Sequence, residues 1–140
     1  SPDHKIFYFA DSRSLAIWAY DYDLETGAVA NKRKFCEFGP EDGLPDGATV
    51  DAEGCVWSAG VYKSKIHRFD PSGKRMQIID MPVVCVTSVM FGGPGLDRLY
   101  ATSMLEAPVP GIVETGALAG SLFVIDGLGV KGLTEYRYGG

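Results

Sequence analysis

The segment Gly43–Gly47, which reads Gly-Leu-Pro-Asp-Gly, places one carboxylate on a rigid piece of backbone. Pro45 fixes its own φ angle and Gly47 permits a positive φ angle, so the sequence predicts a tight turn that holds Asp46 in place. Such a carboxylate suits a hard divalent cation, because these cations take oxygen ligands. On residue types alone the alternative is a simple turn in which the Asp46 side chain caps its own backbone.

Other reactive side chains have local structural explanations. Asp51 and Glu53 lie in a hairpin between two expected strands, and Asp3 lies in the equivalent hairpin of an earlier repeat, so turn formation explains them. His4 and His67 have no acidic or Ser partner at a useful spacing, which gives a Ser-His-Asp nucleophile no support. The sequence also lacks a glycine-rich phosphate loop between a strand and a helix.

Three cysteines, Cys36, Cys55 and Cys85, are widely spaced and sit among apolar neighbours. Their odd number and their settings indicate small buried hydrophobic residues in a reducing compartment, rather than disulfides or a zinc site. We therefore expect a cytoplasmic protein.

The composition excludes two classes of partner. The formal net charge of −5 argues against nucleic acid, because no basic surface is available to replace the counterions of phosphates. Apolar runs stop far short of the roughly 18 residues of a membrane-spanning helix, so no membrane partner is expected. The hydrophobic content of 46% is that of a chain with a packed core.

The elements that must position Asp46 are short strands in a repeating order. An aliphatic–aromatic pair occurs at Ile6-Phe7, Val56-Trp57 and Leu99-Tyr100, and each is followed by a second strand that ends in Asp. Alternating apolar residues between Gly, Pro and Asp turns predict an all-β meander. The expected strands are Lys5–Asp11, Leu15–Asp21, Lys32–Phe38, Ala48–Ala52, Cys55–Ala59, Lys65–Asp70, Arg75–Asp80, Val86–Gly92, Arg98–Ser103, Ser121–Asp126 and Leu133–Tyr138.

The repeat length predicts blades of a β-propeller. The pairs begin at residues 6, 56 and 99, a period typical of four-stranded blades. Residues 1–140 then hold about two and three-quarter four-stranded blades of a single propeller domain, because the first blade lacks its opening strand. Propellers close with 4–8 blades, so we expect a portion of a longer domain. The Pro- and Gly-rich stretch Met104–Gly120 is an expected loop near the channel entrance.

Several stretches together resemble the SMP-30/gluconolactonase family. They run in order over essentially the whole chain: Ser1–Ser12, Ile17–Asp23, Gly43–Gly47, Val50–Gly54, Thr87-Ser88, Phe91–Gly93 and Gly127–Gly132. The resemblance implies a six-bladed propeller with one divalent metal ion in its central channel, and hydrolysis of a sugar lactone to the aldonic acid. It identifies this chain as the C-terminal half.

The resemblance also assigns Asp46 as both the metal-binding and the catalytic carboxylate. Ca²⁺ or Zn²⁺ is the expected ion, and Mn²⁺ or Mg²⁺ also suits the family. The family's other protein ligands fall outside this sequence, so the expected partners are a small sugar lactone and the missing N-terminal half. Because one carboxylate cannot satisfy a cation that prefers six or more oxygens, these 140 residues alone are expected to be inactive.

Three other interpretations remain open at this point. One is a non-catalytic calcium-binding regulatory propeller, as regucalcin-like members of the family have been regarded. Another is an interaction scaffold of unrelated function. A third is the pairing of two half-propellers to close a ring, because each half has strand edges to satisfy.

Overall fold

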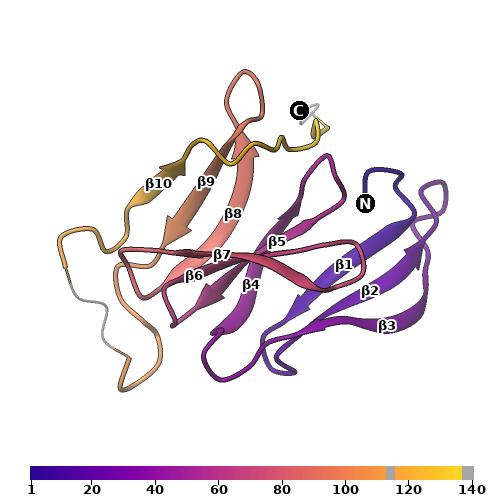
Figure 1. Ribbon diagram of the computed structural model, residues 1–140. Coiled ribbons are helices and arrows are strands. Elements are labelled where there is room, and N and C mark those ends of the chain that lie inside the picture. Colours follow the sequence, from indigo (N-terminus) through magenta and orange to yellow (C-terminus); the bar gives the residue numbers. More distant parts are fainter. Residues whose placement is uncertain (113–115, 137–140) are drawn as a thin grey trace.

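The computed structural model describes residues 1–112 and 116–136, which form ten strands in three antiparallel sheets (Figure 1). The predicted all-β class is confirmed. In the described part of the chain no helix is long and apolar enough to cross a lipid bilayer.

The sheets follow one another along the chain and contain three, four and three strands. The first has the order β1-β2-β3, the second β4-β5-β6-β7 and the third β10-β9-β8. Their bounds are β1 (Ile6–Asp11), β2 (Ala16–Tyr22), β3 (Val29–Glu37), β4 (Leu44–Val50), β5 (Val56–Val61), β6 (Lys65–Phe69), β7 (Arg75–Asp80), β8 (Val86–Gly92), β9 (Arg98–Ser103) and β10 (Leu122–Ile125). Each sheet is one blade of the predicted propeller.

The first sheet lacks the strand that opens the other two. Strands β1, β5 and β9 carry the aliphatic–aromatic pairs, and β4 and β8 pair with β5 and β9 on their inner side. No described strand takes that place beside β1, so β1 is an edge strand. The prediction of a first blade with three strands is confirmed.

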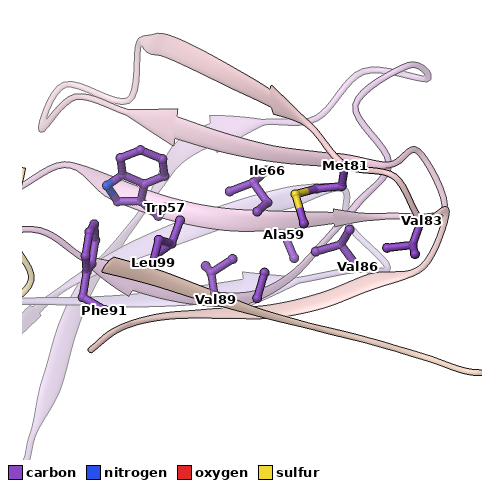
Figure 2. Packing of buried hydrophobic residues seen from close by; sticks show 10 residues of the cluster. Trp57, Ala59, Ile66, Met81, Val83, Val86, Val89, Phe91 and Leu99 are labelled. Atoms are coloured by element: carbon purple, nitrogen blue, oxygen red, sulfur yellow. The ribbon is translucent and has the colours of Figure 1, made fainter. Parts of the chain in front are cut away.

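Apolar side chains fill the spaces between adjacent sheets. Trp57 and Ile66 of the second sheet pack against Val89, Phe91 and Leu99 of the third, and all five are buried (Figure 2). The indole ring of Trp57 meets the Phe91 ring edge to face at 5.8 Å between centroids. This geometry favours the quadrupoles of both rings and fixes the two sheets relative to each other.

A second core joins the first and second sheets. It contains Ile17, Cys36 and Phe38 from the first sheet and its following loop, together with Val56 and Phe69 from the second. All three cysteines of the chain are buried and none forms a disulfide within the described residues, which confirms their expected structural role. Burial raises the pKa of the Cys36 thiol to about 12, so it stays protonated and unreactive.

The last described segment runs to the hairpin between β4 and β5 of the second sheet instead of adding a strand to the third. Lys131 accepts a hydrogen bond from the amide of Ala52 at 2.8 Å, and Gly132 forms a β-bridge with Asp51. Residues 133–136 form no strand, so the predicted strand Leu133–Tyr138 is wrong over those positions, and residues 137–138 lie outside the described ones. Among the described residues the third blade has three strands and not four, because its chain is drawn towards the Asp51 hairpin.

Candidate functional site

Asp46 lies on strand β4 and not in a turn before it, which corrects the sequence-based prediction. Pro45 pairs with Gly60 and Ala48 pairs with Ser58, so Asp46 and Gly47 together stand opposite a single residue of β5. This arrangement is a β-bulge, which bends the strand and re-aims the side chains that it carries. The bulge therefore presents Asp46 from the innermost strand of the second blade.

The positive φ angle expected at Gly47 occurs at the other glycine of this segment. Gly43 has the positive φ angle, 85°, whereas Gly47 is not among the residues with positive φ. Gly47 is instead needed for close packing, because a Cβ atom there would lie 2.2 Å from Ser88 Oγ. The bulge is thus held against strand β8 of the next blade.

Two hydroxyl groups fix the backbone around the carboxylate. Ser12 Oγ donates to the carbonyl of Pro45 at 2.8 Å, and Ser58 Oγ donates to the carbonyl of Asp46 at 3.3 Å. Ser12 comes from the loop after β1 and Ser58 from β5, so two blades hold the bulge. The sequence analysis did not assign this role to Ser12 or to Ser58.

The Asp46 side chain is partly buried and has no counter-charge in the part of the chain that the structure describes. Within the described residues it forms no salt bridge and no hydrogen bond to another side chain. Desolvation raises the pKa of the Asp46 carboxyl above its ordinary value, and the amide of Gly47 only partly offsets this. A carboxylate in this state gains from a bound cation, which supplies the missing charge.

A hollow of about 290 Å³ opens beside Asp46. Tyr8, Phe9 and Ala10 of β1 line one side, and Gly47 and Ala48 of β4 line the other. The hollow follows the unpaired edge of β1, where the first blade lacks its opening strand. Larger hollows occur elsewhere, and one of about 410 Å³ is lined by residues 97–98 and 126–131 near the turns of the third blade, away from Asp46.

The acidic hairpin before β5 brings together Asp51, Glu53 and Cys55, whose ligand atoms lie within 4.8 Å of one another. Asp51 Oδ2 already accepts hydrogen bonds from Arg68 Nη2 at 2.7 Å and from Trp57 Nε1 at 2.9 Å. Its Oδ1 accepts from the amides of Glu53 and Cys55.

Because its oxygens are occupied and Arg68 supplies the positive charge, Asp51 is poorly suited to a cation. The prediction that Asp51 forms a turn is consistent with its two bonds to hairpin amides. The buried ion pair with Arg68 is a further role that the sequence did not indicate.

The remaining candidates are structural. Asp70 caps its own turn through Ser72, Asp21 pairs with Arg33 at 2.7 Å, and Asp126 pairs with Arg98 at 3.1 Å. His67 is fully buried, and its Nε2 lies 2.8 Å from the carbonyl of Asp42, while no serine or carboxylate oxygen of the described residues hydrogen-bonds to its ring. Burial lowers the pKa of this imidazole, so it packs as a neutral ring.

Comparison with known sequences gives a consistent set of relatives. Residues 1–105 match the family described as the SMP-30/Gluconolactonase/LRE-like region. Human regucalcin is 42% identical over 141 residues, which cover 100% of this chain and 47% of the relative. Chicken regucalcin is 39% identical over 141 residues, which again cover 100% of this chain and 47% of the relative. The chain spans about half the length of the curated relatives that it matches.

Comparison with solved structures points the same way. A calcium-binding protein, regucalcin, from Agrobacterium tumefaciens C58 superposes with a TM-score of 0.83 and 29% identity, over 99% of this chain and 48% of that one. A luciferin-regenerating enzyme superposes with a TM-score of 0.81 and 34% identity, over 94% of this chain and 44% of that one. A gluconolactonase from Xanthomonas campestris superposes with a TM-score of 0.63 and 31% identity, over 74% of this chain and 32% of that one.

Proposed function

Because this chain belongs to the SMP-30/gluconolactonase/LRE-like family and forms part of a β-propeller, we propose that it is the C-terminal half of a metal-dependent sugar lactone hydrolase. The reaction proposed is opening of a sugar lactone to its aldonic acid. The observation that carries this proposal is Asp46, a partly buried carboxylate at a bulge of an innermost strand, with no counter-charge among the described residues. The relative named a gluconolactonase supports the reaction type.

The residues around Asp46 fit a divalent cation. The carboxylate offers oxygen ligands, no basic side chain competes for it among the described residues, and the hollow beside it leaves room for further ligands. Ca²⁺ or Zn²⁺ is the proposed ion, and Mn²⁺ or Mg²⁺ is compatible with the same donors. When bound, such an ion would supply Lewis acidity towards the lactone carbonyl.

Asp46 serves first as a cation ligand and only second as a base. Coordination lowers the proton affinity of a carboxylate, so one that holds the cation is a weak acceptor for the proton of an attacking water. The chain's own contribution is to orient this carboxylate, which the bonds from Ser12 and Ser58 to the bulge backbone achieve. Tyr8 and Phe9 border the hollow on the side of β1.

The partner proposed for this chain is the remaining half of the propeller. Its three sheets correspond to about half the length of regucalcin, which agrees with six blades in the complete ring. The free edge of β1 borders the Asp46 hollow, so a strand added there would bring the remaining ligands to the carboxylate. The 140 residues alone are therefore expected to have little or no lactonase activity.

The test of the proposed function is turnover by the complete propeller. Asp46→Ala and Asp46→Asn are compared with the unmodified protein on a panel of sugar lactones, with each divalent cation added in turn. We expect both variants to lose at least about 100-fold in kcat/KM, because removing a metal ligand costs more than the 10- to 100-fold typical of residues behind the ligands. Full activity in both variants would refute the role of Asp46.

A second candidate function is a calcium-binding regulatory propeller without catalysis. The description of the Agrobacterium relative as a calcium-binding protein favours it. The same lactone panel separates the two functions, because a regulatory propeller would bind Ca²⁺ through Asp46 but would hydrolyse none of the lactones. The compartment proposed is the cytoplasm, on the evidence of three buried cysteines without a described disulfide.

A further inference from the structure

Strand β8 of the third blade carries a bulge like the one that presents Asp46. Val86 pairs with Ser103 and Ser88 pairs with Thr102, so Thr87 is the extra residue on β8. In both blades two residues of the innermost strand therefore stand opposite one residue of the next strand.

The two bulges occupy equivalent positions in their blades. The single residue opposite the bulge is Ala59 in the second blade and Thr102 in the third. Each lies three residues after the start of its aliphatic–aromatic pair, at Val56 and Leu99. Thr87 is therefore the structural counterpart of Asp46.

The two bulges also touch each other. A Cβ atom on Gly47 would lie 2.2 Å from Ser88 Oγ and 2.6 Å from Ser88 Cα, so the backbones of β4 and β8 approach closely at this point. Asp46 directly precedes Gly47, and Thr87 directly precedes Ser88. They thus stand at the same level on adjacent innermost strands.

The side chain of Thr87 is held in place and keeps hydrogen-bonding capacity. It is half-buried, and its Oγ1 lies 2.8 Å from Oγ1 of Thr102 on β9. A hydroxyl has one donor and two acceptor sites, so this contact leaves Thr87 free to bond a second group. Being neutral, it does not compete with a cation for Asp46, and its chemistry matches a sugar hydroxyl.

We infer that Thr87 contacts the substrate, forming a hydrogen bond to a hydroxyl group of the sugar ring while Asp46 serves the cation. This inference rests on the proposed lactonase function and names a residue that determines which lactone is preferred. It assigns the third blade a part in substrate recognition that the family resemblance did not give to any residue of that blade.

The test is kinetic, on the complete propeller with its cation. Thr87→Val removes the hydroxyl but keeps the shape, and we expect KM to rise about 3- to 10-fold, the range for loss of one neutral hydrogen bond. Cation affinity should not change, and Thr87→Ser should restore KM. Thr49→Val is the matched control, because Thr49 lies further along β4 and its hydroxyl bonds, among the described residues, to the sulfur of Met90. Unchanged KM in Thr87→Val would overturn the inference.

Deoxy-lactones distinguish direct contact from a purely structural role. For one deoxy position, the unmodified protein and Thr87→Val should become equal in KM, because the hydroxyl that Thr87 bonds is absent from the substrate. If the ratio of KM in Thr87→Val to KM in the unmodified protein is the same for every deoxy-lactone, Thr87 acts only through the fold, which contradicts the inference.

Binding keeps the inference testable even if the proposed reaction fails. If the complete propeller hydrolyses no lactone, titration calorimetry with a linear sugar alcohol and Mn²⁺ replaces kinetics. Weaker binding by Thr87→Val than by Thr49→Val supports a polyol-contacting role without catalysis. Equal binding by the two variants, or no binding by the unmodified protein, overturns it.

Discussion

At the scale of single residues, Asp46 and Asp51 show how context separates two carboxylates that are five positions apart. Asp51 is fully buried, yet its oxygens are saturated by Arg68, Trp57 and two hairpin amides. Asp46 is more exposed and has no such partners among the described residues. The less buried carboxylate is therefore the one available to a ligand, because binding depends on unsatisfied charge as well as on depth.

The raised pKa of Asp46 makes a prediction about metal-free stability. A carboxyl whose pKa is higher in the folded state than in the unfolded one favours folding when protonated, so its charged form weakens the fold as pH rises through the folded-state value. We therefore expect Asp46→Asn to unfold at a slightly higher temperature than the unmodified protein at pH 7 without metal. The gain should be small, because solvent screens a half-exposed group.

The control for this prediction is pH. The difference between Asp46→Asn and the unmodified protein should disappear near pH 3, where both carry a neutral side chain at position 46. Thermal unfolding followed by circular dichroism at both pH values measures it. An Asn variant that is less stable at pH 7 would show that the carboxylate has a stabilising partner.

The buried ion pair gives a larger effect. Asp51→Ala leaves Arg68 and the indole N–H of Trp57 without their acceptor, so we expect a loss of about 3–5 kcal/mol in the free energy of unfolding. Glu53→Gln is the matched control, because Glu53 is exposed and its pair with Arg68 is worth about 0–1 kcal/mol. Urea unfolding of the three proteins measures the difference. Equal losses in both variants would mean that burial does not distinguish the two acids.

At the scale of elements, alternation and turn residues were sufficient to place most strands. The strands Arg75–Asp80, Val86–Gly92 and Arg98–Ser103 were predicted with the bounds that the structure has. Leu133–Tyr138 was not, because an alternating pattern says nothing about whether a neighbouring strand edge is available to pair with it.

The bulge at Asp46 could not be predicted for a similar reason. A bulge is defined by the register of the partner strand, here Gly60 and Ser58 of β5, and turn chemistry read from Gly43–Gly47 alone does not contain it. The role of Gly47 depends on Ser88, which is 41 positions away in the chain. Local residue types therefore predicted the candidate carboxylate but misassigned the backbone that carries it.

The contact between the two bulges can be tested by substitution. Gly47→Ala places a methyl group against Ser88, so we expect a loss of about 1–3 kcal/mol in unfolding free energy from overpacking. Adding Ser88→Gly should recover part of this loss, because Ser88 Cα would still lie close to the new methyl group. Gly39→Ala is the control, since its Cβ would lie 3.4 Å from the nearest atom. A harmless Gly47→Ala would mean that β4 and β8 are not in close contact.

At the scale of the whole molecule, the three sheets form an arc with two unsatisfied ends (Figure 1). Phe7 and Phe9 of β1 are 44% and 48% exposed at one end, and Leu122 and Val124 of β10 are 63% and 48% exposed at the other. Apolar side chains gathered on an exposed sheet face mark a surface that packs against another element. These ends agree with a chain that spans about half the length of its relatives.

This architecture predicts the behaviour of the separate half. The purified 140 residues should self-associate and hydrolyse lactones no faster than their own Asp46→Ala variant. Co-expression with the other half of the propeller should yield a monodisperse complex that is active. Light scattering and a lactonase assay measure both properties. A monomeric half with turnover above its Asp46→Ala control would contradict the proposed need for the other blades.

The central claim is that Asp46 is a ligand of a divalent cation, and Mn²⁺ titration of the complete propeller tests it most directly. Free Mn²⁺ can be followed by electron paramagnetic resonance, with Asp46→Asn compared against the unmodified protein and Glu53→Gln as the control. We expect Asp46→Asn to weaken Mn²⁺ binding by at least about 100-fold, and Glu53→Gln to leave it unchanged. Mn²⁺ binding of equal affinity in Asp46→Asn and the unmodified protein would contradict the account.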